Sequence, residues 1–209
     1  FGALEFAQTL IGAGIQPIMG TQLNLEDARG QGEIVLLAQT DLGYTNLSKL
    51  LSKTLLDADG VHDPSCSFDD LEAHAQGLIL LSGGALAGFV GAPAGDGRPT
   101  LAVARADRLA AIFGDRFYIE LQRHGLGIER TAEPHLLEIA DRLNLPLVAT
   151  NDCRFENAAM SQPHDALVCI GTGRKFSETN RPRFSPEHYF KNAAQMSELF
   201  HDIPEAISN

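Results

Sequence analysis

Polar residues stand at the ends of several apolar segments that have the length of β-strands, and their side chains could bind a metal ion or a phosphate group. They are Gln22 after the first segment, Glu33 before the second, His124 after the fourth, and Asp152 and Arg154 after the fifth. In parallel α/β folds, functional side chains gather at the carboxyl ends of the strands. If these groups converge on one rim, they provide the donors that a metal or phosphate site needs.

Each of these residues also has a purely structural interpretation. His124 could be an ordinary loop histidine, and Asp152 could cap the next turn. His188 lies in polar surroundings, which predicts an exposed, unligated side chain. The dinucleotide-binding, P-loop, zinc-protease and serine-hydrolase motifs are absent from the sequence. The residues alone therefore indicate an α/β domain with a polar rim.

The composition is that of an acidic globular domain. Asp and Glu number 27 against 16 Lys and Arg, which gives a formal net charge of −11. This charge repels phosphate, so a broad nucleic-acid-binding face is not expected. No apolar run reaches the roughly 20 residues that span a bilayer, and the start resembles no signal peptide. Three cysteines without a CxxC pair suit a reducing cytoplasm and argue against structural zinc.

Short apolar segments alternate with amphipathic helices along the chain, which predicts an α/β fold with a mainly parallel sheet, either open or closed into a barrel. The strands are expected at residues 15–20, 34–38, 77–82, 117–121 and 146–150. The clearest helices are expected at residues 41–56, 102–113 and around 136–143, with others near 165–170 and 192–200. A polar loop is expected at residues 24–32, and a weak helix with an exposed loop at 85–99.

The pattern continues without a convincing boundary, so residues 1–209 are predicted to form one domain. The chain starts inside a helical pattern without Met, and it stops where Asp202 and Pro204 indicate the start of another helix. Both ends are therefore expected to be cut from a longer polypeptide.

Several stretches, all in one order, resemble the PHP (polymerase and histidinol phosphatase) domain at the amino end of bacterial DNA polymerase III alpha subunits. The resemblance runs nearly end to end and rests on residues 1–6, 14–20, 36–38 with 43–47, 77–84, 118–125 (YIELQRHG), 145–152 (LPLVATND) and 198–206. It implies a distorted (β/α)7-type barrel, here incomplete at the amino end because the family's first strands would precede residue 1. It also implies a rim that, in active relatives, holds divalent metal ions and hydrolyses phosphoesters, in polymerases as a 3′–5′ exonuclease.

The metal-binding pattern of the family is broken in this sequence. Its His-x-His motif would lie before the first residue, and Gln22 stands where the resemblance implies an acidic ligand. Glu33 and Arg154 stand where the resemblance implies histidines. Only His124 and Asp152 keep the ligand types of the family.

Arg154 is the change with the largest consequence. A guanidinium stays charged and has no lone pair to give to a metal. At about 4 Å and an effective dielectric constant of about 20, a pair of unit charges is worth roughly 4 kcal/mol, and a divalent ion would feel about twice that repulsion. The rim is therefore predicted to be degenerate, with Arg154 paired to Asp152 or Glu33 in place of the metals. Residual Zn²⁺ or Mn²⁺ at His124 and Asp152 is the alternative, and Mg²⁺ is expected only for the polymerase portion.

A structural and subunit-docking domain without catalytic residues of its own is the first functional hypothesis. Its expected partners are the polymerase portion of the same chain and the proofreading exonuclease subunit, with DNA contacted only through the polymerase and with no membrane association. The second hypothesis is a metal-dependent phosphoesterase or 3′–5′ proofreading exonuclease that uses His124, Asp152 and Glu33. The third is an unrelated α/β enzyme, which an open sheet would favour.

Overall fold

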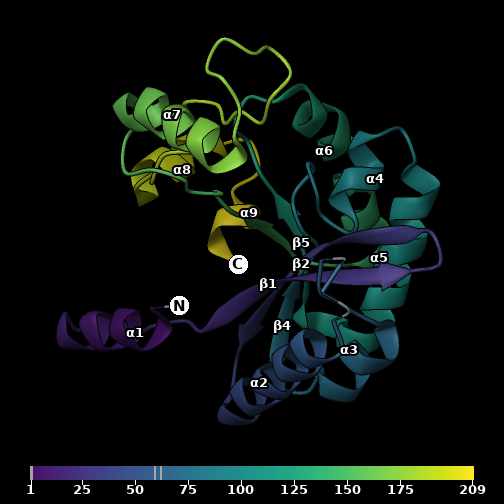
Figure 1. The fold of residues 1–209 in the computed structure, drawn as a ribbon. Coiled ribbons are helices and arrows are strands. Elements are labelled where there is room, and N and C mark those ends of the chain that lie inside the picture. The colour runs from purple at the N-terminus through teal and green to yellow at the C-terminus, as the bar shows by residue number, and fades with distance from the viewer. Residues whose placement is uncertain (1, 59, 62) are drawn as a thin grey trace.

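The fold alternates helices with the strands of one sheet, as the computed structural model of residues 2–58, 60–61 and 63–209 shows (Figure 1). The helices are α1 (Ala3–Gly12), α2 (Asp41–Leu56), α3 (Phe68–His74), α4 (Gly91–Gly95), α5 (Pro99–Phe113), α6 (Gly127–Leu143), α7 (Ser161–Thr172), α8 (Ala193–Leu199) and α9 (Glu205–Ser208), with short 3-10 helices at Gly114–Arg116 and Ala158–Met160. The strands are β1 (Gly20–Asp27), β2 (Gly30–Ala38), β3 (Ser65–Cys66), β4 (Leu78–Leu81), β5 (Phe117–Leu121) and β6 (Leu147–Ala149). The predicted α/β class is confirmed.

The six strands form one mixed sheet in the order β3-β1-β2-β4-β5-β6. β1 and β2 pair antiparallel, as do β2 and β4, whereas β1 with β3, β4 with β5, and β5 with β6 pair parallel. Among the described residues, β3 and β6 form the two edges, so these strands make an open sheet. A distorted barrel of the PHP type would need further strands to join these two edges.

A long β-hairpin replaces two of the predicted elements. The strand expected at residues 15–20 and the loop expected at residues 24–32 are both wrong, because β1 and β2 pair over their whole length from Gly20 with Leu37 to Asp27 with Gly30. The polar residues alternate with buried leucines in β1, which is a strand pattern with one open face. Gly30 closes the hairpin with a φ of +118°, a conformation that favours glycine.

The segment between β4 and α5 was expected to be a weak helix with an exposed loop. It does contain the short helix α4, but residues 88–94 are mostly buried. Phe89, Val90 and Ala94 are fully buried within it. The guanidinium of Arg105 in α5 lies 3.9 Å from the centre of the Phe89 ring. A composition of Gly, Ala and Pro looks like a flexible loop in a sequence, but small residues also allow a segment to pack closely on its neighbours.

The two faces of the sheet have different neighbours. On one face, alternate strand residues form the core with the helices: Leu23, Leu25, Ile34, Leu36, Leu78, Leu80, Phe117 and Ile119 are buried there. α2 packs on β2 and β4, and α5 and α6 pack on β5. Because successive side chains of a strand point to opposite faces, the residues between these core positions project from the other face of the sheet.

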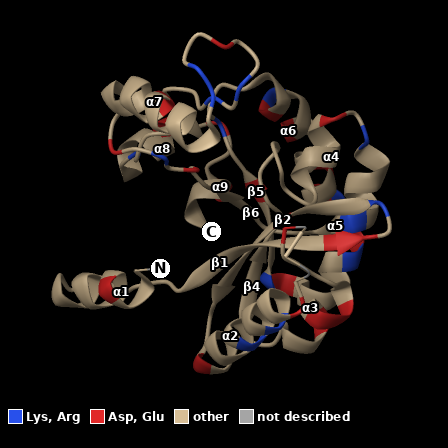
Figure 2. Ribbon diagram, in the orientation of Figure 1, with Lys and Arg blue, Asp and Glu red and all other residues tan. Residues whose placement is uncertain are grey.

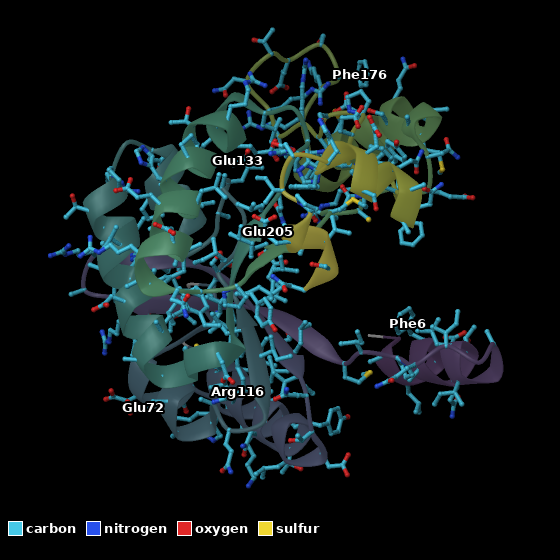
Figure 3. The ribbon with its side chains drawn as sticks, turned by 180° about the vertical axis from the view of Figure 1, so that it is seen from behind. Phe6, Glu72, Arg116, Glu133, Phe176 and Glu205 are labelled. Carbon is cyan, nitrogen blue, oxygen red and sulfur yellow. The ribbon has the colours of Figure 1, made fainter. Side chains whose placement is uncertain are left out.

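Helix α1 stands apart from the rest of the molecule in both views of the ribbon (Figures 1 and 3). It buries no residue, and its Leu4, Phe6 and Ile11 side chains are exposed. Glu5 is its single charged residue, whereas α2 and α5 carry charges of both signs (Figure 2). No helix in the described part of the chain is both long and apolar enough to cross a bilayer.

Candidate functional site

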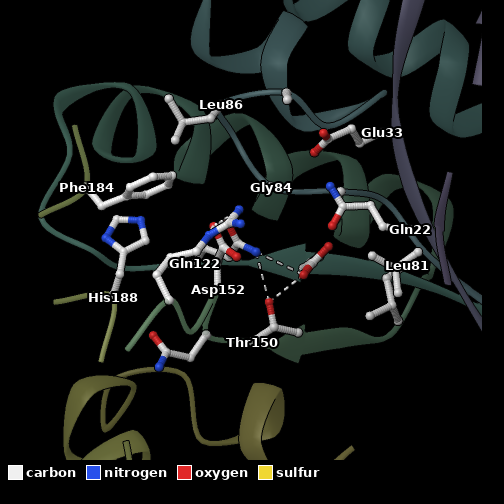
Figure 4. Close-up of a pocket in the computed structure, with 16 residues that line it drawn as sticks. Gln22, Glu33, Leu81, Gly84, Leu86, Gln122, Thr150, Asp152, Phe184 and His188 are labelled. Atoms are coloured by element: carbon white, nitrogen blue, oxygen red, sulfur yellow. Dashed lines mark hydrogen bonds and ion pairs between the residues drawn. The ribbon is translucent and has the colours of Figure 1, made fainter. Parts of the chain in front are cut away.

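A cavity of about 390 Å³ lies on the face of the sheet that projects away from the helical core (Figure 4). Four of the five predicted site residues line it: Gln22 from β1, Glu33 from β2, and Asp152 and Arg154 from the segment after β6. The structure therefore brings together side chains that are far apart in the sequence. His124, the fifth, does not line the cavity.

The register of the hairpin explains why Gln22 and Glu33 point toward this cavity. Gln22 lies opposite Val35, and both line the cavity. Their chain neighbours Leu23 and Ile34 are buried in the helical core. Since side chains alternate along each strand, the polar residues must project to the opposite side, where the cavity lies.

Glycine backbone forms the wall of the cavity next to Glu33. Gly83 has a φ of +78°, and a Cβ at this position would lie 2.3 Å from the carbonyl oxygen of Glu33. A Cβ at Gly88 would lie 2.3 Å from the carbonyl carbon of Gly83. The N–H of Phe89 donates to the carbonyl oxygen of Glu33 at 2.8 Å. Glycine at positions 83 and 88 therefore lets the loop lie directly against β2 and fixes the backbone of Glu33.

His124 is held by protein groups on both sides of its ring. It is 2% exposed, and its Nδ1 and backbone N each lie 2.7 Å from a carboxylate oxygen of Glu129. Its Nε2 lies 3.1 Å from Oδ1 of Asn151 and accepts from the N–H of Asp152 at 3.2 Å. These contacts bury the His124 ring in the loop after β5 and hold it against Glu129 and the backbone of Asp152.

His188 is buried against His124, although its polar surroundings predicted an exposed side chain. It is 1% exposed, and its ring stacks on that of His124 with centroids 3.9 Å apart. Phe184 packs edge-on against the other side of the His188 ring. Burial, together with the neighbouring His124, lowers the pKa of His188, so the ring is neutral at pH 7. The prediction was wrong because this stacking joins residues far apart in the chain.

Arg154 pairs with Asp152, which is one of the two partners predicted for it. Its Nε and Nη2 donate to the same carboxylate oxygen of Asp152 at 3.0 and 2.8 Å. The guanidinium carbon also lies 4.8 Å from the centre of the Phe184 ring. The two charged side chains are 41% and 32% exposed, so water screens their attraction.

Replacing Arg154 with alanine is expected to change the free energy of unfolding by less than about 1 kcal/mol, the usual range for an exposed ion pair. A larger loss, of roughly 1 to 3 kcal/mol, would follow only if the Asp152 carboxylate were buried and left unpaired. Urea unfolding of the wild type and the variant measures the difference. A loss above about 2 kcal/mol would show that the pair is shielded from water, contrary to the structure.

Glu120 on β5 is a buried carboxylate of the cavity wall. It is 4% exposed, its Oε1 accepts from Thr150 Oγ1 and, at 3.1 Å, from Gln122 Nε2, and its Oε2 has no hydrogen-bond partner among the described residues. Burial raises the pKa of Glu120, and the hydrogen bonds from Thr150 and Gln122 only partly oppose the rise. The backbone N–H of Gly83 also acts to lower the pKa of Glu120, although it does not form a hydrogen bond of normal geometry with the carboxylate.

The variant Glu120→Gln is expected to stabilise the domain at neutral pH by about 1 kcal/mol, because it removes a poorly solvated charge. An acid whose pKa is higher in the folded than in the unfolded state binds more protons when folded, so stability falls as pH rises from 4.5 toward the raised pKa. Unfolding free energies measured across this pH range should fall less steeply in Glu120→Gln than in the wild type. Parallel curves would contradict the raised pKa.

Comparison with known protein families shows to which family this chain belongs. The model of the PHP domain matches residues 1–124, more than half of the 209 residues. The chain belongs to the PHP domain family. The resemblance inferred from the sequence is thus confirmed, and the hypothesis of an unrelated α/β enzyme is wrong even though the described strands form an open sheet.

Curated relatives match this PHP domain along its whole length. It is 42% identical to the DNA polymerase III subunit alpha of Caulobacter vibrioides (strain NA1000 / CB15N), over 100% of the chain and 19% of that relative. It is 41% identical to the corresponding subunit of Rickettsia bellii (strain RML369-C), over 100% of the chain and 18% of that relative. It is 37% identical to the subunit of Pseudomonas aeruginosa, over 99% of the chain and 18% of that relative. The chain spans about one fifth of the length of these relatives.

The cavity of this PHP domain does not fit the divalent metal cluster that the resemblance implies. Among the described residues, no three His, Cys, Asp or Glu side chains are grouped so that they could hold one ion. The guanidinium of Arg154 lines the cavity and is bound to Asp152, while both ring nitrogens of His124 contact protein groups.

Three residues that shape the site were not predicted from the sequence to belong to it: Glu120, Glu129 and His188. The alternation of β5 contained a signal for Glu120, because Phe117, Ile119 and Leu121 are its apolar positions and Glu120 must project from the other face. Glu129 and His188 had no comparable local signal. Their roles depend on contacts with His124 that only the folded chain brings about.

Proposed function

We propose that this PHP domain is a non-hydrolytic structural domain of a bacterial DNA polymerase III alpha subunit that acts in DNA replication in the cytoplasm. The observation that carries the proposal is the position of Arg154, whose guanidinium is bound to Asp152 at the cavity where active relatives would hold metal ions. A permanent cation at this place repels a divalent ion and cannot coordinate it.

Two further features of the cavity support a structural role. Gln22 contributes a neutral amide instead of an anionic ligand, which lowers the negative charge available to a metal. His124 is fixed by Glu129 and by the backbone of Asp152, so its ring connects segments of the fold. The ion pair and these hydrogen bonds join the segments that a metal cluster would otherwise hold together.

A metal-dependent phosphoesterase or 3′–5′ proofreading exonuclease is the second candidate. The observation that favours it is the presence of two acidic side chains at the cavity, Glu33 and Glu120, that leave carboxylate oxygens without partners among the described residues. Carboxylate oxygens are ligands for hard divalent ions. This candidate needs residues that precede Phe1 to complete its ligand set.

A nuclease assay on the full-length protein separates the two candidates. With Mn²⁺ or Zn²⁺ and no deoxynucleotides, we expect no release from a 3′-labelled primer beyond that seen with Asp152→Ala, because Arg154 prevents a metal from binding. Primer extension with Mg²⁺ by the wild type and by Asp152→Ala is the control for folding. Metal-dependent release that disappears in Asp152→Ala would establish the phosphoesterase and overturn the structural role.

The structural role includes the partners expected of such a domain. We propose that residues 1–209 support the polymerase portion of the same chain and dock the proofreading exonuclease subunit, with DNA contacted only through the polymerase. Deletion of residues 1–209 is expected to abolish co-purification of the exonuclease subunit. Unchanged co-purification would contradict the docking role. It would not bear on hydrolysis, which the primer assay tests separately.

A further inference from the structure

Helix α7 turns an apolar, uncharged side toward solvent at the periphery of the molecule (Figure 1). Met160, which directly precedes the helix, is 41% exposed, and Leu167 and Ile170 are 65% and 77% exposed. Together with Pro163, which is also exposed, these residues are spaced three, four and three positions apart, so they form one stripe about 15 Å long. Single exposed apolar side chains are common, but a continuous stripe indicates a binding surface. We call these four residues the α7 stripe.

The opposite side of α7 is attached to the rest of the domain. Cys169 is buried there, and Asp165, one turn before it, is the single charged residue of the helix. Both carboxylate oxygens of Asp165 accept from the guanidinium of Arg181, whose side chain is 2% exposed. Because residues four positions apart lie on the same side of a helix, this charge points away from the α7 stripe. The helix is therefore held from behind, and its apolar stripe faces solvent.

The spacing of the α7 stripe is symmetric about Asp165. Met160 and Ile170 each lie five positions from Asp165 in the sequence. Pro163 and Leu167 each lie two positions from it. Two copies of the helix packed antiparallel would therefore place Met160 against Ile170 at both ends of the contact. Pro163 would lie against Leu167 near its centre. An apolar stripe that matches itself in this way is complementary to a second copy of this chain.

The charges at the two ends of α7 follow the same symmetry. Glu156 and Arg174 each lie nine positions from Asp165, and both side chains are exposed. The residue that caps α7, Gly173, has a φ of +64°, and the N–H of Arg174 donates to the carbonyl oxygen of Cys169 at 2.9 Å. This turn fixes Arg174 at the carboxyl end of the helix. In an antiparallel pair, Arg174 of each copy lies next to Glu156 of the other, whereas a parallel pair would set like charges side by side.

Helix α1 also exposes apolar side chains, but they do not form a stripe of this kind. Leu4 and Ile11 lie on one side of α1, and Phe6 lies on the opposite side. A pair of helices needs one continuous apolar face on each partner. Since α1 is the rival surface for self-association, the experiment must distinguish it from α7.

We propose that two copies of this chain associate through their α7 stripes, packed antiparallel about a two-fold axis. The exposed Ala166 and Gly171 at the margins of the stripe allow the two helices to approach closely. One helix face is smaller than the roughly 800 Å² per partner of a standard interface, so the dimer is weak, with a Kd on the order of tens of micromolar. The inference does not depend on the proposed function, because no residue of α7, all of which is described, lines the cavity.

Sedimentation velocity of the full-length protein, at concentrations from about 1 to 100 µM that bracket this Kd, tests the inference. The wild type is expected to shift from monomer to dimer, and Leu167→Glu is expected to weaken the dimer by about tenfold or more, because it places a charge in the apolar contact. Leu56→Glu is the matched control, since Leu56 is 83% exposed on α2, far from α7 (Figure 1). Ile11→Glu tests the rival surface on α1 and should leave the dimer unchanged. Primer extension by each variant is the control for folding.

Reversal of the terminal charges tests the antiparallel arrangement. Glu156→Arg and Arg174→Glu are each expected to weaken the dimer about fivefold, because the symmetric dimer contains two copies of this exposed ion pair. The double variant carries both reversals and should return to about the wild-type Kd. This restoration distinguishes a contact between the two residues from a general effect of net charge.

Hydrogen exchange of the full-length protein at the same concentrations completes the test. The amides of residues 161–172 should exchange more slowly as the concentration rises, whereas those of residues 3–12 should not change. A protein that stays monomeric overturns the inference, as does a dimer that Leu167→Glu leaves unchanged or Ile11→Glu abolishes. A double charge reversal that does not restore the dimer overturns the antiparallel pairing on which the proposal depends. None of these outcomes alters the proposed function, which the primer and co-purification assays test separately.

Discussion

Replacing Arg105 with alanine is expected to destabilise the domain by about 3 to 5 kcal/mol, the loss typical of removing one partner of a buried ion pair. Arg105 is 6% exposed, and its Nε and Nη2 each donate to a different carboxylate oxygen of Asp27 at 2.9 Å. It also donates to the carbonyl oxygens of Phe89 and Gly30 at 2.9 and 3.0 Å. The variant leaves the carboxylate of Asp27, which is 15% exposed, without its cation.

The measurement is urea unfolding together with hydrogen exchange of the amides in β1, β2 and α4. The Arg105 contacts join the closed end of the hairpin to α5, so these amides should exchange faster in the variant than in the wild type. Arg98→Ala is the matched control, since Arg98 and its partner Asp96 are both about half exposed. Equal losses in the two variants would contradict a special role for the buried pair.

The same pair predicts an acid-dependent loss of stability. Burial alone would raise the pKa of Asp27, but the hydrogen bonds and charge of Arg105, with the Arg29 backbone, lower it below 3.8. An acid whose pKa is lower in the folded state stabilises the protein above its unfolded pKa, and this contribution disappears as pH falls through the folded pKa. Between the folded and the unfolded pKa of Asp27, the stability of Arg105→Ala should therefore depend less on pH than that of the wild type.

Replacing Glu129 with alanine is expected to destabilise the domain by roughly 2 to 4 kcal/mol, because it leaves several buried donors without an acceptor. Glu129 is 5% exposed and accepts from the backbone N and Nδ1 of His124 and from the N–H of Leu126, at 2.7, 2.7 and 3.0 Å. Ser185 Oγ donates to the carbonyl oxygen of His124 at 2.7 Å, so the segment that carries His188 should loosen too.

Hydrogen exchange of residues 184–189 and urea unfolding measure this effect. The matched control is Glu138→Ala, which removes an exposed carboxylate from the same helix, α6. Although burial alone would raise the pKa of Glu129, hydrogen bonds from His124 and Leu126 lower it, so this stabilisation also weakens as pH falls. A variant as stable as the control, with unchanged exchange at residues 184–189, would show that Glu129 does not support the cavity.

The sequence was sufficient to predict those elements whose apolar pattern is local. β4 and β5 and helices α2 and α5 lie within a few residues of their predicted positions, because each has a continuous apolar run or a helical stripe. The β1–β2 hairpin was missed because its open face carries Gln22, Asn24 and Glu33, and polar residues next to glycines resemble a loop. Which face of the hairpin lines the cavity depends on how the whole sheet packs, and a local pattern does not reveal this.

The site was predictable in part, and the resemblance to the PHP family carried most of that prediction. It placed Gln22, Glu33 and Asp152 with Arg154 at one location, where the structure has them. It also suggested His124 as a remnant ligand, whereas the structure turns both of its ring nitrogens toward protein groups. The orientation of that ring depends on Glu129 and His188, whose contacts with it form only in the folded chain.

The hairpin register has a consequence for how the length of this chain can vary among relatives. Gln22 and Glu33 reach the cavity because β1 and β2 pair without a bulge from one end to the other. An insertion or deletion of one residue within either strand would turn the following side chains to the opposite face, burying charge among leucines. Length changes should therefore be confined to the turn beyond Asp27, or should come in pairs within a strand.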